Sequence, residues 1–180
     1  MRINVNDALF CLVDVQERLF PHMANKEIIE ANLVTLIKGL KLHEVPFIVN
    51  EQYKKGLGET IPAVRELIDA DPHFEKVTFS CCKNDGTLEA IKNSGKKVVI
   101  VAGIETHVCV LQTCLDLLAE GLQPVLVTDC VTSRAEYNTI MAIERLVQAG
   151  VIPTTYESIL FELTVSAKSP VFKEISKLVK

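Results

Sequence analysis

The chain has 180 residues, of which almost half are apolar, and it contains no tryptophan. This length predicts one domain over residues 1–180 that is large enough to bury a real core. The formal net charge of −4 is spread without blocks of like sign, which argues against nucleic acid as a partner because such binding sites usually present a basic face.

The first predicted element is a strand at Ala8–Val13, a continuous apolar run. No apolar run in the chain approaches the ~20 residues that a membrane-spanning helix needs, so no membrane partner is expected. The first run is also too short for the core of a secretion signal, and the acidic Asp7 and Asp14 flank it where basic residues are usual. The sequence therefore predicts a cytoplasmic protein.

Further strand-like runs alternate with helix-like runs along the whole chain. The remaining strands are predicted at Val45–Val49, Val77–Phe79, Lys97–Ala102, Pro124–Thr128 and Val151–Thr154. The helices are predicted at Glu27–His43, Ile61–Ile68, Gly86–Asn93, Thr106–Glu120, Ala135–Ala149, Glu157–Leu163 and Ser169–Val179. Three of these helices are closed by Gly95, Gly121 and Gly150, at the position where a helix C-terminus favours a left-handed residue.

The composition of the strands indicates how they are covered. Most are rich in Val and Ile and do not alternate with polar residues, which is typical of parallel strands buried on both faces. Repeated strand–helix–strand units then predict a three-layer α/β/α fold around a doubly wound parallel sheet of about six strands. Ligands of such sheets bind beyond the carboxyl ends of the strands, near the point where the winding reverses.

Three residues with distinctive chemistry fall near the predicted strands. Asp14 ends the first strand, and Cys109 follows the turn after the fourth. If the first and fourth strands are neighbours at the switch point, these two side chains face one crevice. Lys76 stands at the start of the predicted third strand, and Lys83 is the other lysine close by.

The position of Cys109 favours reactivity. It lies at the predicted start of a helix, where unpaired N–H groups and the positive end of the helix dipole favour thiolate over thiol. The thiolate is the nucleophilic form, so the sequence predicts an ionised thiol. A pair with His107 is not favoured, because a first-turn residue two positions earlier points away. The structural alternatives are a small core cysteine, a capping acid at Asp14 and a solvent-exposed Lys76.

Several segments together resemble the isochorismatase-like cysteine hydrolase superfamily, over essentially the whole chain. They are Asp14-x-Gln16, Lys76 before Phe79-Ser80, Gly103-x-x-Thr106-x-x-Cys109, and the segment Glu51-Gln52-Tyr53-Lys54-Lys55-Gly56-Leu57-Gly58. The last of these matches the compact isochorismatase-domain-containing subgroup.

The resemblance implies a catalytic triad of Asp14, Lys76 and Cys109. A carboxylate beside a thiol can take its proton, and a nearby ammonium favours both anions. The thiolate would attack an amide carbonyl and form a thioester, which Asp14 and water would hydrolyse. The resemblance also implies an oxyanion hole of the Cys109 and Glu105 N–H groups, with a cis peptide between Ile104 and Glu105.

The expected substrate pocket is lined by six residues at or after the ends of the predicted strands: Gln16, Gln52, Tyr53, Phe79, Thr106 and His107. Asp129 is expected to make a structural hydrogen bond near Ser133 and Arg134. Nicotinamidases of the superfamily carry a metal after the second strand, but Asn50–Tyr53 offers no histidine and the chain has no Cys-x-x-Cys pair, so neither metal nor cofactor is expected. A homo-oligomer is expected from the relatives and from a mean hydropathy of +0.25.

The sequence thus favours a cofactor-free cysteine hydrolase that acts on a small amide or related carbonyl compound. Because the triad includes a cysteine, isochorismate is not the expected substrate: the superfamily's isochorismatases do not use a thiol nucleophile. The alternative is a non-catalytic binding or scaffold protein with a relic pocket, motivated by the absence of a metal site. Cleavage of nucleic acid is the third hypothesis, and the negative net charge disfavours it.

Overall fold

The computed structural model describes residues 1–180 and contains one six-stranded sheet in which every strand pair is parallel. The strands are β1 (Ala8–Val13), β2 (Phe47–Gln52), β3 (His73–Lys76), β4 (Val98–Ile104), β5 (Gln123–Thr132) and β6 (Ile152–Thr154). Their spatial order is β3-β2-β1-β4-β5-β6, so the winding reverses between β1 and β4. The doubly wound sheet predicted from the sequence is confirmed.

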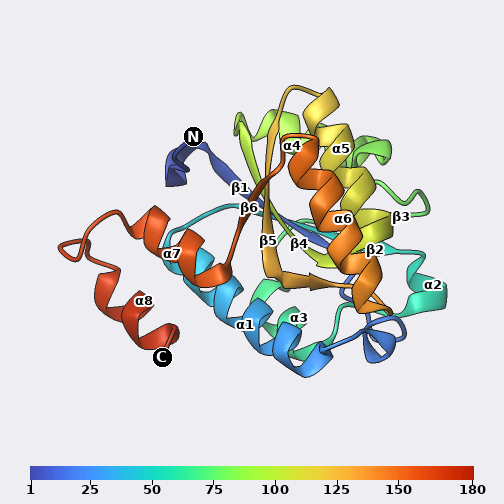
Figure 1. Ribbon diagram of the computed structural model, residues 1–180, viewed down its shortest axis with the longest axis horizontal. Coiled ribbons are helices and arrows are strands. Elements are labelled where there is room, and N and C mark those ends of the chain that lie inside the picture. Colours follow the sequence, from blue (N-terminus) through green and yellow to red (C-terminus); the bar gives the residue numbers. More distant parts are fainter.

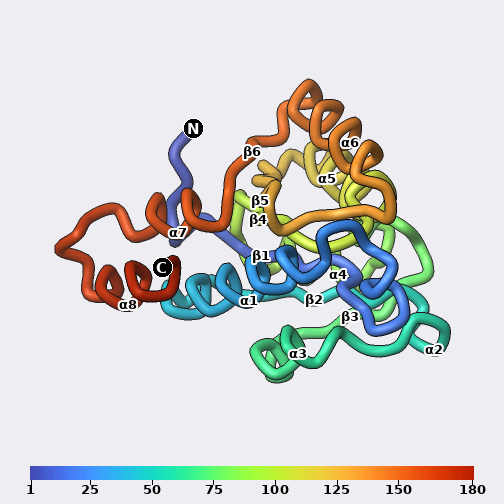
Figure 2. Tube along the Cα trace, turned by 60° about the horizontal axis from the view of Figure 1, so that its bottom comes forward, coloured from blue at the N-terminus to red at the C-terminus, as the bar shows by residue number.

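The helices occupy two layers, one on each face of the sheet (Figures 1 and 2). They are α1 (Lys26–Leu42), α2 (Lys54–Leu57), α3 (Pro62–Ile68), α4 (Asp85–Asn93), α5 (Leu111–Ala119), α6 (Glu136–Gln148), α7 (Tyr156–Thr164) and α8 (Phe172–Leu178). One core joins α1, α3, α7 and α8 to the sheet, and a second core joins α4, α5 and α6 to the opposite face.

The division into two cores follows from the period of a β-strand. Successive side chains of a strand point to opposite faces. In β1, Phe10 and Leu12 belong to the core under α1, whereas Leu9 and Cys11 belong to the core under α5. All six residues of β1 are buried, which explains why the strand carries no polar alternation.

Several boundaries differ from the expectations: β2 runs over Phe47–Gln52 instead of Val45–Val49, and β5 extends to Thr132 instead of Thr128. Two further differences bear on the candidate site. The third strand runs over His73–Lys76, earlier than the predicted Val77–Phe79, so Lys76 ends the strand. The predicted helix Thr106–Glu120 begins with a π-helical turn, Thr106–Val110, before α5. The glycines at 95, 121 and 150 have the left-handed φ expected of helix ends. None of the helices combines the length and apolar character needed to cross a bilayer.

Candidate active site

The switch point between β1 and β4 brings the two ends of the predicted site together. Val13 of β1 is paired with Gly103 of β4, so Asp14 and the turn after Ile104 leave the sheet side by side. Gly103 has φ +125°, and a Cβ atom there would lie 2.0 Å from the carbonyl oxygen of Val13. Only glycine allows β4 to approach β1 this closely.

Lys76 reaches this point from the far side of β2. It ends β3 opposite Gln52, and its side chain is fully buried. The Nζ atom lies 2.7 Å from Asp14 Oδ2 and 2.6 Å from Gln52 Oε1. It also donates to the carbonyl oxygens of Thr78 and Phe79, at 3.2 and 3.0 Å. The segment Val77–Phe79, which was predicted to be a strand, therefore provides two backbone carbonyls that accept hydrogen bonds from the Lys76 ammonium.

Lys83 does not share this position. Its side chain is 64% exposed and its Nζ lies 3.7 Å from Asp116. Of the two lysines left open by the sequence, only Lys76 contacts Asp14.

Cys109 lies in the π-helical turn, with only 6% of its surface exposed. The N–H groups of Val108 and Val110 both donate to the Glu105 carbonyl, at 3.1 and 3.2 Å, and hold the turn against the end of β4. The peptide bond between Ile104 and Glu105 is cis. The Glu105 carboxylate accepts hydrogen bonds from the backbone N–H and the Nε of Arg134, both at 3.1 Å.

A cavity of about 170 Å³ opens between these elements. Its lining combines polar groups with an apolar majority: Asp14, Leu19, Gln52, Leu57, Phe79, Glu105, Val108 and Cys109. Asp14 and Cys109 thus border one space, as expected from the strand order. Leu19, Leu57 and Val108 were not anticipated, because only the fold carries these separate loops to the same rim.

Four of the expected pocket residues do not line this cavity. Gln16 is fully buried and ties loops together, donating to the carbonyls of Gln52 and Gly58 and accepting from the Gln52 N–H. The Tyr53 ring lies against Gly56 and is half exposed. Thr106 is buried outside the lining, and His107 bonds to Ser133 Oγ at 2.9 Å.

Asp129 also differs from expectation. Its Oδ1 accepts a hydrogen bond from the Tyr156 N–H at 2.9 Å, at the start of α7. It therefore braces β5 against α7 and does not hold the backbone near Ser133 and Arg134. The reason is that β5 extends to Thr132, which moves the strand end beyond Asp129.

The charge states of the buried groups correct the expectation of a resting thiolate. Burial raises the pKa of Asp14 to about 6, against the lowering effect of the Lys76 ammonium. Burial and the Asp14 carboxylate raise the pKa of Cys109 above that of a free thiol, and Lys76 only partly opposes them. Burial lowers the pKa of Lys76, but the net shift is upward, chiefly because of the charge and the hydrogen bond of the Asp14 carboxylate. Cys109 is therefore a neutral thiol beside a carboxylate.

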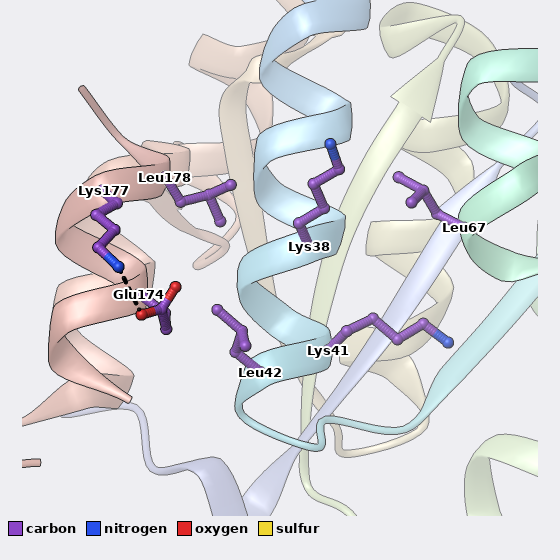
Figure 3. A pocket seen from close by; sticks show the side chains of 7 residues that line it. All are labelled: Lys38, Lys41, Leu42, Leu67, Glu174, Lys177 and Leu178. Atoms are coloured by element: carbon purple, nitrogen blue, oxygen red, sulfur yellow. Dashed lines mark hydrogen bonds and ion pairs between the residues drawn. The ribbon is translucent and has the colours of Figure 1, made fainter. Parts of the chain in front are cut away.

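The largest cavity of the molecule lies elsewhere (Figure 3). Its volume is about 590 Å³, and α1, α3 and α8 line it with lysines, leucines and the Glu174–Lys177 pair. Lys41 of this cavity stands over the Phe47 ring at the beginning of β2, so the cavity lies at the amino ends of the strands. It contains no cysteine, serine or threonine. No group of three His, Cys, Asp or Glu side chains anywhere is arranged to hold a metal.

Comparison with known proteins places this geometry in a family. The isochorismatase domain matches residues 8–158. Isochorismatase domain-containing protein 1 of Salmo salar is 36% identical over 178 residues, which cover 99% of this chain and 62% of the relative. The chain thus spans a little over six tenths of that relative's length.

Two solved structures share the whole architecture. The MAR1 ribonuclease of Caenorhabditis elegans has 37% identity and a TM-score of 0.94, covering 99% of this chain and 92% of its own. The YcaC gene product of Escherichia coli, described as an octameric hydrolase of unknown specificity, has 26% identity and a TM-score of 0.94 over 99% of this chain and 89% of its own. The chain belongs to the isochorismatase family.

Proposed function

We propose that this protein is a cofactor-free cysteine hydrolase of small amides or related carbonyl compounds. Membership of the isochorismatase family indicates a hydrolase. The observation that carries the finer proposal is that Asp14, fully buried and paired with Lys76 behind it, borders the same cavity as Cys109. A carboxylate and a thiol at one small cavity, with an ammonium held behind the carboxylate, are groups suited to nucleophilic acyl transfer.

In the proposed reaction, Asp14 takes the proton of Cys109 as the sulfur attacks the amide carbonyl carbon. The pKa of about 6 keeps Asp14 ionised at neutral pH yet makes it a stronger base than an ordinary aspartate. The tetrahedral intermediate collapses when the C–N bond breaks and Asp14 returns the proton to the leaving nitrogen. Ammonia leaves, and the acyl group remains on sulfur as a thioester.

Hydrolysis of the thioester uses the same groups in reverse. Asp14 removes a proton from water, the oxygen attacks the acyl carbon, and the thiolate leaves and is reprotonated. Lys76 keeps Asp14 in place and limits its pKa through the 2.7 Å contact. The backbone N–H groups of Glu105 and Cys109 are the proposed donors to the oxyanion.

The test is release of ammonia from a panel of small primary amides by the wild type and the Cys109→Ala variant. Turnover that disappears in Cys109→Ala, while the far-ultraviolet circular dichroism is unchanged, supports the proposal. Equal turnover in both proteins overturns it. Cys114→Ala is the matched control, because Cys114 is fully buried in α5 and lies outside the cavity lining.

Two other activities are tested in the same preparation. The resemblance to the C. elegans MAR1 ribonuclease suggests an assay for RNA cleavage at low salt. RNA binding would need cationic surface to contact phosphates, and its affinity would fall steeply with salt. A protein that turns over no amide and binds a partner independently of Cys109 would fit a non-catalytic scaffold instead.

We propose also that the chain assembles with copies of itself through α6. Tyr137, Ile140, Met141 and Val147 of this helix are 70%, 48%, 44% and 44% exposed, an apolar face without a partner in the chain. The neighbouring Glu144 and Arg145 take part in none of its ten ion pairs. Two antiparallel copies of α6 could satisfy both charges reciprocally, as a two-fold interface requires.

Light scattering after size exclusion tests this assembly. We expect Met141→Glu to lower the particle mass and Ile28→Glu, a matched exposed site on α1, to leave it unchanged. An unchanged mass in Met141→Glu, or a monomeric wild type, contradicts the α6 interface. A cytoplasmic location stays a prediction, tested by fractionation.

A further inference from the structure

We infer that the cavity selects uncharged, compact primary amides with an apolar acyl group and rejects amides that carry a carboxylate. This inference rests on the proposed function and adds the class of substrate. It follows from which polar atoms of the cavity are already satisfied and which are not.

The cavity offers no cation to a substrate anion. Its lining contains no Arg, no His and no Lys. Lys76 lies behind Asp14 and has three N–H donors, but four acceptors already surround it: Asp14 Oδ2, Gln52 Oε1 and two backbone carbonyls. The Lys76 ammonium therefore has no N–H group free to donate a hydrogen bond to a substrate carboxylate.

The amide group of Gln52 already makes two hydrogen bonds. Its Oε1 accepts from Lys76 at 2.6 Å, and its Nε2 donates to the Val77 carbonyl at 2.9 Å. Gln52 therefore keeps one Nε2 hydrogen for a ligand, and this neutral donor cannot balance the charge of a substrate carboxylate.

One buried oxygen at the cavity has no N–H or O–H donor. Asp14 Oδ1 is shielded from solvent, Oδ2 is paired with Lys76, and the only other group near this carboxylate that can donate to it is the Cys109 thiol, a weak donor. A buried acceptor without a partner is costly, and a ligand N–H can satisfy it. A primary amide brings two N–H donors, whereas a carboxylate brings only acceptors and negative charge.

The apolar lining and the volume of the cavity limit the size and the polarity of the substrate's acyl group. Leu19, Leu57, Phe79 and Val108 form the apolar part of the lining. The volume of about 170 Å³ lies below the roughly 300–1,000 Å³ usual for pockets of drug-sized ligands. An acyl group of a few carbon atoms fits this description, and a long or charged one does not.

Butyramide and succinamate test the inference, because they differ only in the replacement of a terminal methyl by a carboxylate. We expect kcat/KM for butyramide to exceed that for succinamate by at least ~100-fold, since the carboxylate would be desolvated without a partner. Leu57→Arg, which adds a cation at the rim, should narrow that ratio by at least ~10-fold. Leu57→Met is the matched control and should preserve the ratio.

Binding gives a readout that does not need turnover. Butyramide should protect Cys109 from iodoacetamide, measured by peptide mass spectrometry, and succinamate at the same concentration should not. Equal protection or equal kcat/KM overturns the inference while the hydrolase stands, and so does failure of butyramide to protect. Protection by butyramide without hydrolysis of any amide would instead overturn the proposed function and leave the selectivity of the cavity intact.

Discussion

The Lys76 ammonium and the Asp14 carboxylate lie 2.7 Å apart with both side chains withdrawn from solvent. The contact joins the end of β3 to the end of β1 across the intervening β2. The ion pair therefore connects the carboxyl ends of strands that lie on one side of the switch point. A buried charge that loses its partner is strongly destabilising, so this pair has a structural role besides any role in chemistry.

Lys76→Met should lower the free energy of unfolding by about 3–5 kcal/mol, because it leaves a buried carboxylate unpaired. The double variant Asp14→Asn/Lys76→Met should recover at least ~1 kcal/mol of that loss. Asparagine suits position 14 because it tolerates the left-handed φ of +53° found there. Urea titration measures both values. A double variant no more stable than Lys76→Met would show that the charge pair is not the source of the effect.

The pH dependence of kcat/KM should show an acidic limb near pH 6. The proposed base is the ionised form of Asp14, whose pKa burial raises to about 6. Activity should therefore be lost as pH falls through 6 and the carboxyl is protonated, and it should be retained above. Initial rates with a subsaturating amide measure the limb. A limb near pH 4, the ordinary range of an exposed aspartate, would contradict the buried environment of Asp14.

Alkylation of Cys109 should respond to its two charged neighbours in opposite directions. The Asp14 carboxylate raises the pKa of the thiol and the Lys76 ammonium lowers it. The pH at which iodoacetamide reacts at half its maximal rate should therefore fall in Asp14→Asn and rise in Lys76→Met.

The control for this experiment is His107→Asn. His107 bonds to Ser133 and lies outside the cavity lining, so its replacement should leave the alkylation profile in place. If the pH profile of alkylation shifts strongly in His107→Asn and not in Asp14→Asn, then His107, and not Asp14, controls the ionisation of Cys109.

The sequence predicts most of the architecture because burial on both faces leaves a clear signal. The strand β1 runs over Ala8–Val13 as expected, and β4 and α6 differ from expectation by one or two residues at each end. The carboxyl ends of β2 and β5 lie three and four residues beyond the predicted ends, and β3, a four-residue edge strand in which only Lys76 is buried, does not overlap its predicted range at all. Short edge strands carry little apolar pattern, so the expectation fell on the more apolar Val77–Phe79 that follows.

The candidate site is predictable in its residue types and less so in its electrostatics. Helix-start geometry indicates a thiolate at Cys109, but that argument is local and omits burial beside Asp14. Gln16 is close to Asp14 in sequence and was predicted to line the pocket. The turn after β1 instead directs its amide to the carbonyls of Gln52 and Gly58, contacts between residues distant in sequence that no local pattern encodes.

Gly103→Ala should destabilise the protein by at least ~2 kcal/mol, because the new Cβ would overlap the backbone of Val13 in a conformation that side chains disfavour. Gly95→Ala is the matched control: it also has a positive φ, but nothing lies within 4 Å of its new Cβ. Its cost should be about 1 kcal/mol. Thermal or urea unfolding compares the two, and equal losses would argue against the close approach of β4 to β1.

The role of Cys109 as the nucleophile is tested by the intact mass of the enzyme quenched in acid during turnover of butyramide. A thioester mechanism predicts a population heavier by one butyryl group, mapped by peptide analysis to Cys109 and absent from Cys109→Ala. Butyramide hydrolysis that persists in Cys109→Ala, or an acyl group found on another residue of the wild type, would contradict it.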